Sequence, residues 1–485
     1  MTRPMLTLLA AAAIGLTGCT SSGTHAVKPH RSSTPSSTLE LRRTDLTGKQ
    51  RLYGASLGRD QGIGYQPDVV VLGGGADAVQ SVSSDGLVWT IDHRAAGATQ
   101  LAVGRIMVAT TQAVGRVLRL DHQGDTDRVV LGPVSLTDVI RNADLASAGP
   151  ISLTQPLFYA TPGAPGSNPP PSTTPGSRFA GGADDHGFAS TQGAATSAPP
   201  LPPPTTQPEP VSSGEFRFTP LWNADGIGVE AYANHGHGHV RARFQLQVQR
   251  PEVTFRLVID GGRIVEASIR IHGAGGIHVH IDAEELDASG SFKGTTIAVP
   301  ITMSFPIGAL ELSLTQDITI TPQLAGQAFI DSKGYYGLAG DLTFGIGVPQ
   351  GVGVSVSKVI EPMNRNTASY GAAASSFAFG WGIKASVGIG IHGFSAGAFI
   401  ELMFSGAVAA DVGLDVLHPG CVKDSLYLHY LYGLGYRVPV IVMHAVNLLL
   451  AVFGVDAIPA SGGLTRGPFA VWSPAPSEYC PGYDH

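Results

Sequence analysis

The sequence holds 485 residues, with 30 basic and 37 acidic side chains and a formal net charge of −7 at pH 7. Nucleic-acid binding requires clustered Lys and Arg, and this chain is mildly acidic, so we expect no nucleic-acid partner. The length allows more than one domain.

An export signal is expected at the N-terminus. Arg3 precedes an apolar run, Met5–Leu16, which is too short to span a bilayer as a helix. The next residues, Leu16-Thr17-Gly18-Cys19, resemble the lipobox of bacterial lipoproteins. The resemblance implies that residues 1–18 are removed and that the Cys19 thiol carries acyl chains, which anchor the protein to the extracytoplasmic side of the cell membrane. An ordinary secretory signal with an accidental cysteine is the alternative.

Two segments with different composition follow the signal. Residues 19–44 begin with Ser, Thr, Gly and Pro, a composition typical of a flexible tether. Residues 45–160 predict a small β-rich domain, because short β-branched runs alternate with Gly or Asp-Gly turns. One helix is expected over Ser135–Leu145. The expected strands are Val69–Leu72, Leu87–Ile91, Arg105–Val108 and Val117–Leu120.

The clearest boundary is the segment 161–214, which contains 13 of the 34 prolines. Its Gly, Ser and Thr residues and its proline runs cannot bury enough apolar surface to fold alone. The segment therefore predicts a disordered linker between two domains. A recognition site for a proline-binding partner is the alternative.

Residues 215–485 predict a large antiparallel β domain. From His239 to Gln249 apolar and polar residues alternate, which indicates a long half-buried strand, and later segments repeat the pattern. We expect turns at Arg250-Pro251 and at Ala274-Gly275-Gly276. Many such strands rarely stay flat, so the meander should curl into a barrel or half-shell. The apolar segment Pro439–Val455 predicts one C-terminal helix. The fold class is therefore mainly β.

The histidines of this domain are candidate metal ligands. His235, His237 and His239 lie two residues apart, so a strand would present all three on one face. His278 and His280 repeat the spacing, and a turn at 274–276 would place His278 opposite His272. Three or four converging imidazoles could bind zinc or copper. The alternative is a solvated polar face that happens to contain histidine.

The segment Gly393-Phe394-Ser395-Ala396-Gly397 resembles the nucleophile elbow of the α/β-hydrolases. The resemblance implies Ser395 as nucleophile, with acidic and histidine partners downstream. However, the elbow must begin a helix, and the residues after Ser395 keep a period of two. A hairpin turning at His392-Gly393 explains the pattern better, so we expect no catalytic residue here. The downstream candidates are Asp411, Asp415, His418, His429 and His444.

Cysteine usage predicts one disulfide. Lipid would occupy Cys19, which leaves Cys421 and Cys480 as an even pair in an exported protein. A disulfide would also exclude a membrane span by the uncharged segment Val438–Val455, because a span would place the two cysteines on opposite sides of the membrane. No phosphate loop, zinc-protease motif or paired-cysteine metal motif occurs, and we expect no cofactor.

Three functions remain open. A lipid-anchored envelope lipoprotein could hold a lipid or other apolar ligand inside a curled sheet. A structural or adhesive surface protein needs only an exposed domain pair on flexible tethers. A serine hydrolase using Ser395 is the third, and we expect an enzyme less than either binding role. A large apolar cavity would favour the first function and a filled core the second.

Overall fold

The computed structural model describes most of the chain from Thr38 to Cys480. The expected signal, the lipobox-like segment with Cys19 and most of the expected linker therefore lie outside the described residues, as does nearly all of the apolar segment 438–455, for which a helix is expected. The residues that are not described are 1–37, 43–44, 58–61, 84–85, 154–155, 159–209, 214, 224–225, 236–237, 286–290, 294–296, 326–327, 339–340, 347–355, 372–374, 392–393, 411–420, 438–446, 448–460, 474–476 and 481–485.

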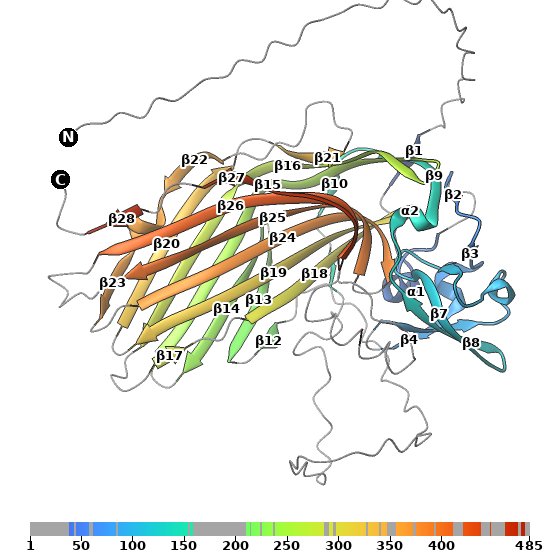
Figure 1. The fold of residues 1–485 in the computed structure, drawn as a ribbon, viewed down its shortest axis with the longest axis horizontal. Helices are drawn as coiled ribbons and strands as arrows, with labels where there is room; N and C mark the ends of the chain where they lie inside the picture. The colour runs from blue at the N-terminus through green and yellow to red at the C-terminus, as the bar shows by residue number, and fades with distance from the viewer. Residues whose placement is uncertain are drawn as a thin grey trace, which may run out of the picture. The chain divides into compact units, whose positions relative to one another are not determined.

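A six-stranded sheet forms the small N-terminal β domain (Figure 1). Its strand order is β3-β6-β7-β8-β5-β4, with β3 parallel to β6 and the other neighbours antiparallel. Trp89, Ile91 and Val117 are fully buried in its core. All four strands predicted here are confirmed. The strands are β3 (Val69–Val71), β4 (Val79–Val82), β5 (Val88–Asp92), β6 (Ile106–Val108), β7 (Val114–Gln123) and β8 (Thr126–Gly132).

Helices are short in this part of the chain. The predicted helix over Ser135–Leu145 is wrong beyond its first turn, because α2 spans only Leu136–Val139 and strand β9 (Ile140–Ser147) follows directly. Ser135 and Asp138 form a capping box that starts the turn, and pairing with other strands then draws the chain into an extended conformation. The other helices of the described residues are also short: α1 (Gly48–Tyr53), η1 (Gly75–Ala78), η2 (Ala98–Gln100) and, much later in the chain, η3 (Met363–Asn366).

Residues before the linker already belong to the large β fold. Strand β9 pairs with β15 (Gly238–Asp260), and so does β10 (Ile151–Ser152), while β11 (Leu157–Phe158) pairs with β18 (Ile297–Ile307). Two short N-terminal strands, β1 (Leu39–Leu41) and β2 (Gly64–Tyr65), also pair with β9. The linker therefore interrupts the large fold, whereas the sequence pattern placed it between two domains.

The first large sheet has the order β12-β13-β14-β15-β16-β20-β22. Its long strands are consecutive hairpins up to β16, and the chain then crosses to the second sheet before it returns at β20. Besides β1, β2, β9 and β10, its strands are β12 (Val211–Ser213), β13 (Phe216–Asn223), β14 (Gly226–His235), β15 (Gly238–Asp260), β16 (Arg263–Glu285), β20 (Ala328–Leu338), β21 (Leu342–Ile346), β22 (Val356–Glu361) and β23 (Ala368–Gly371).

The second large sheet has the order β11-β18-β19-β24-β25-β26-β27. In Figure 1 its yellow-to-red strands lie in front of the green strands β13 and β14. The mainly antiparallel β fold class is confirmed, and no helix in the described part of the chain is long and apolar enough to cross a membrane. The strands are β17 (Ser291–Lys293), β18 (Ile297–Ile307), β19 (Leu310–Ala325), β24 (Ser375–Ile391), β25 (Phe394–Ala410), β26 (Val422–Arg437), β27 (Ser461–Trp472) and β28 (Ser477–Tyr479).

The inner faces of the two large sheets form one hydrophobic core. The Phe244 ring of β15 lies 5.2 Å from the Phe379 ring and 6.0 Å from the Trp381 ring of β24, centroid to centroid. Tyr336 of β20 contacts Phe404 of β25 at 5.4 Å. Each aromatic side chain buries roughly 150–250 Å² in such a position, so these contacts carry much of the stability of the fold.

One polar residue crosses this core. Gln316 of β19 is fully buried; its Nε2 donates to the Gly228 carbonyl oxygen of β14 at 3.1 Å, and its Oε1 accepts from Trp381 Nε1 at 3.1 Å. A buried amide needs such partners to offset the loss of its hydration. Gln316 therefore joins the two sheets through satisfied hydrogen bonds.

The β15–β16 hairpin turns at Gly261-Gly262, where both glycines have positive φ. The predicted turns at Arg250-Pro251 and at 274–276 are therefore wrong. At Arg250-Pro251, strand β15 continues through a shift of register between Val248 and Glu252. At 274–276, strand β16 continues through a shift that lies opposite Gln247 and Val248. Proline and glycine are tolerated at such β-bulges, because a bulge leaves one residue outside the hydrogen-bond ladder.

Candidate functional site

The outer face of the first large sheet is polar. Alternation along β15 places Phe244 and Leu246 in the core, so Arg243, Gln245 and Gln247 lie on the opposite face. The register of β16 sets His280 opposite Arg243 and His278 opposite Gln245. On the next strand, β20, Lys333 pairs with His280 and Tyr335 with His278.

A hollow of about 380 Å³ lies on this outer face. We call it the outer hollow. Guanidinium, ammonium, amide, imidazole and carboxylate groups surround it, so it offers many hydrogen-bond donors and acceptors beside the apolar surface of the same side chains. Its polar lining residues are Arg243, Gln245, Gln247, His278, His280, Lys333 and Glu361.

An aromatic stack forms one part of the outer hollow. The His278 ring is stacked on the Tyr335 ring, with 4.2 Å between centroids and 29° between planes. His278 Nε2 lies 3.3 Å from Gln247 Oε1, and the Tyr335 hydroxyl donates to the Gly275 carbonyl at 3.0 Å. Burial lowers the pKa of His278; the charge of Glu361 opposes this shift and that of Arg243 adds to it. His278 is therefore mainly neutral at pH 7 and can both donate and accept.

Charged pairs border the stack. Asp331 accepts from both sides, with His280 Nε2 at 3.1 Å from Oδ1 and Lys333 Nζ at 3.4 Å from Oδ2. Arg243 directs its guanidinium to Gln245 Oε1 at 3.2 Å. Pairs on partly exposed strands contribute little to stability, which leaves these groups able to exchange partners with a ligand.

The predicted histidine metal site is not assembled by the histidines whose side chains are described. The His239 side chain lies 3.3 Å from that of Asp282 and 3.7 Å from that of Glu284. His239 is also four residues along β15 from Arg243, the residue that pairs with His280. His278 and His280 each have a separate partner. His237 lies outside the described residues, and of His235 only the backbone, at the end of β14, is described. The expected pairing of His278 with His272 is wrong, since both lie on β16.

Ser395 lies at the start of β25 and pairs with Gly390 of β24. The chain after it stays extended to Ala410, so the G-x-S-x-G segment begins a strand and not the helix that a nucleophile elbow needs. Ile391 of β24 pairs with Phe394 of β25, so the predicted hairpin joins these strands, and its turn residues His392 and Gly393 lie outside the described residues. His429 lies on β26 opposite Met403, far along β25 from Ser395. The other four candidate partners of Ser395 lie outside the described residues.

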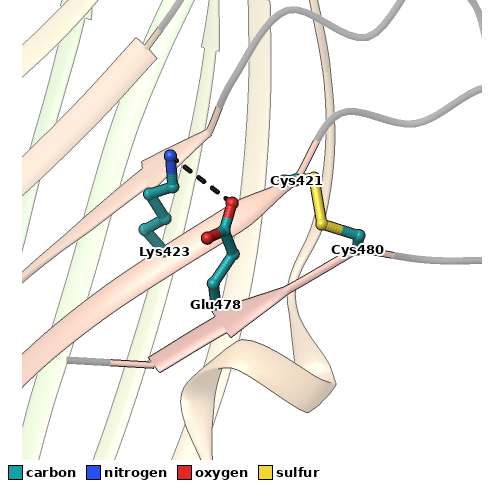
Figure 2. Close-up of a disulfide and its surroundings, with 4 residues drawn as sticks. All are labelled: Cys421, Lys423, Glu478 and Cys480. Atoms are coloured by element: carbon teal, nitrogen blue, oxygen red, sulfur yellow. Dashed lines mark ion pairs between the residues drawn. A yellow bond between two sulfur atoms is a disulfide. The ribbon is translucent and has the colours of Figure 1, made fainter. Parts of the chain in front are cut away.

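Cys421 and Cys480 are at disulfide distance, with their Sγ atoms 2.11 Å apart (Figure 2). The pair stands at the end of the short β26–β28 ladder, in which Val422 pairs with Tyr479. Beside it, Lys423 Nζ lies 3.4 Å from Glu478 Oε1. Antiparallel pairing thus brings the two cysteines opposite one another, as the sequence predicts.

A second cluster of chemically active residues was missed by the sequence analysis. In the part of the chain that the structure describes, His93, His122 and Asp127 bring imidazole and carboxylate ligand atoms within 4.8 Å of one another. The Gly124-Asp125 turn could have placed His122 opposite Asp127 from sequence alone. Nothing local in the sequence points to His93.

A family model described as a domain of unknown function (DUF8402) matches residues 196–466, more than half of the chain. The chain belongs to the DUF8402 family. The DUF8402 match contains every strand that lines the outer hollow. A second model, also described as a domain of unknown function (DUF8403), matches residues 49–142 and thus the small sheet. Comparison with curated proteins and with solved structures finds no match.

Proposed function

We propose that this protein is a lipid-anchored adhesive protein of the bacterial cell envelope, and that it binds a polyhydroxylated ligand, such as a surface saccharide, in the outer hollow. The lipobox-like segment ending at Cys19 supports the anchor. The outer hollow carries the binding proposal, because it combines amide, guanidinium and carboxylate groups with an aromatic stack. Sugars present hydroxyl groups to such polar partners and C–H faces to rings.

An apolar ligand held between the sheets is supported less well. That function needs an internal cavity, and the facing side chains of the described strands fill the interior with aromatic contacts. The space lined by Ala267, Phe399 and Leu434, where strands of both sheets meet, measures about 10 Å³. A lipid chain requires a far larger volume, because ligand pockets usually exceed roughly 300 Å³. The outer hollow reaches that range, and most of its lining residues carry polar groups.

A binding experiment tests the proposal. The purified full-length chain in detergent should bind members of a panel of immobilised bacterial polysaccharides. Arg243→Ala and Gln247→Ala should each weaken that binding at least about 10-fold, which corresponds to the loss of one or two hydrogen bonds to a ligand. Arg241→Ala is the matched control, since Arg241 lies on the same face of β15 but is paired with Glu230 outside the hollow.

Two outcomes would contradict the proposal. Equal losses from Arg241→Ala and Arg243→Ala would mean that general charge, and not the outer hollow, holds the saccharide. Co-purification of a stoichiometric lipid in native mass spectrometry, together with no polysaccharide binding, would restore the apolar-ligand function.

A further inference from the structure

The small sheet brings two histidines and one aspartate together from three chain segments. His122 on β7 pairs directly with Asp127 on β8 across the hairpin. His93 follows the last residue of β5, the other neighbour of β8, and its backbone N–H donates to the Asp125 carbonyl at 2.9 Å. All three side chains are thus held by one rigid piece of sheet, the condition under which a site keeps its geometry.

The carboxylate of Asp127 lies at the centre of this group. His93 Nδ1 is 2.9 Å from Oδ2 and His122 Nδ1 is 2.8 Å from Oδ1, so each oxygen faces one imidazole. The two rings lie 4.3 Å apart, centroid to centroid. The Asp127 side chain is 4% exposed, whereas those of His93 and His122 are 36% and 55% exposed. A buried negative charge is therefore covered by two imidazoles that solvent can reach.

We propose that His93, His122 and Asp127 bind a divalent transition-metal ion of the Zn²⁺ class. Imidazole nitrogen and carboxylate oxygen are ordinary zinc ligands, and sites with three protein ligands leave a fourth position for water. Bonds of roughly 2.0–2.2 Å in tetrahedral geometry set neighbouring ligand atoms about 3.3 Å apart. The present distances from the two Nδ1 atoms to the Asp127 oxygens are shorter by about half an ångström, and small rotations of the two exposed rings can lengthen them. The ion would also balance the buried charge of Asp127.

Two hydrogen-bonded imidazoles alone would also satisfy Asp127, and the experiment separates the two roles. Asparagine in place of histidine keeps a side-chain N–H near the position of Nδ1 but provides no imidazole ligand. The variants His93→Asn and His122→Asn can therefore retain the hydrogen bond to Asp127 while they remove a metal ligand. His280→Asn is the matched control, because His280 also contacts one aspartate but lies outside the cluster of His93, His122 and Asp127.

The full-length chain, first treated with a chelator, is titrated with Zn²⁺ in a calorimeter and with Co²⁺ in a visible absorption measurement. We expect one Zn²⁺ per chain, tetrahedral Co²⁺ bands, and an affinity reduced at least about 100-fold in His93→Asn and His122→Asn. His280→Asn should bind as the unaltered chain does. Circular dichroism without metal checks that each variant is folded.

Absence of Zn²⁺ binding by the unaltered chain would overturn the proposal. So would Zn²⁺ binding that His122→Asn leaves unchanged, because the three-ligand site needs that imidazole. Binding lost in His280→Asn instead would transfer the metal to the outer hollow and contradict the assignment made here. The outcome does not depend on whether a saccharide binds there.

Discussion

Gln112, in the loop before β7, donates a hydrogen bond from Nε2 to Oε1 of Glu311 at 3.0 Å and so joins the small sheet to β19 of the second large sheet. Both side chains are buried. Burial raises the pKa of Glu311, although hydrogen bonds from Ser304, Gln112 and Thr111 oppose the shift. The backbone adds a second link, because the Gly390 N–H donates to the Thr111 carbonyl at 2.8 Å.

Glu311 should make stability depend on pH. Its folded pKa lies above the ordinary value of 4.5, so between these two values the folded chain holds a proton that the unfolded chain has released. The contribution of Glu311 to the free energy of unfolding is therefore fully present below pH 4.5, and it is lost as pH rises through the raised pKa of the folded chain. Glu311→Gln, which cannot ionise, should raise Tm at pH 8 and flatten Tm against pH. Calorimetric scans from about pH 4 to pH 8 measure both effects.

The control for Glu311 is Glu230→Gln, a change in a partly exposed ion pair with Arg241. It should shift Tm little, because such pairs contribute only about 0–1 kcal/mol. An unchanged or steeper pH profile in Glu311→Gln would contradict the raised pKa of Glu311.

Gln316→Leu should destabilise the large fold by about 2–4 kcal/mol, because Trp381 Nε1 and the Gly228 carbonyl would lose their buried partner. Urea denaturation followed by Trp fluorescence measures the change. Gln247→Leu on the outer face is the control, with an expected change below about 1 kcal/mol. Equal stabilities of Gln316→Leu and the unaltered chain would show that the inter-sheet hydrogen bonds contribute nothing.

Removal of the disulfide should weaken the end of the second sheet. The cysteines are 59 residues apart, and closing a loop of that length stabilises the fold by roughly 4 kcal/mol in the chain-entropy treatment. We expect Cys480→Ser, or reduction of the unaltered chain, to lower the urea midpoint accordingly. Lys423→Ala removes the neighbouring ion pair (Figure 2) while the disulfide stays intact, and it should change stability by less than about 1 kcal/mol. Free thiols at both positions in non-reducing peptide mapping would refute the pairing.

Cys19→Ala should abolish retention in the membrane fraction and leave the β domains folded, because the proposed anchor is the acylated thiol. Fractionation followed by immunoblotting measures the distribution, and circular dichroism of the released protein checks its fold. Recovery of Cys19→Ala in the membrane at the original level would mean that another part of the chain holds it there.

Alternation of apolar and polar residues predicted which faces of the long strands are buried. Val240, Phe244 and Val248 are in the core and Arg241 is on the outer face, as a period of two requires. This signal is local and strong because one-sided burial repeats along each strand. It could not show that the chain crosses from β16 to a second sheet, since strand order depends on contacts between distant residues.

Turn positions explain why the expected pairing of His272 with His278 is wrong. Gly275 and Pro251 look like turn residues, yet both lie at bulges within strands of 23 residues, while the actual turn is Gly261-Gly262. Glycine and proline relieve the backbone in either setting, so the residue types alone do not separate a bulge from a turn. The observed register therefore differs from the predicted one, and His272 and His278 lie on the same strand. His93 was missed because only tertiary pairing brings it beside Asp127.

The position of β9 has a consequence for a severed chain. Ala143 and Ala146 of β9 pair with Ile259 and Arg256 of β15, and β11 pairs with β18, so strands encoded before the linker complete sheets encoded after it. Cleavage at a protease site inserted within 161–209 would therefore yield two polypeptides that stay together as one folded particle, joined by backbone hydrogen bonds and a shared core. With the anchor proposed at Cys19, the fragment that carries this residue would keep its partner at the membrane, and separation would require a denaturant.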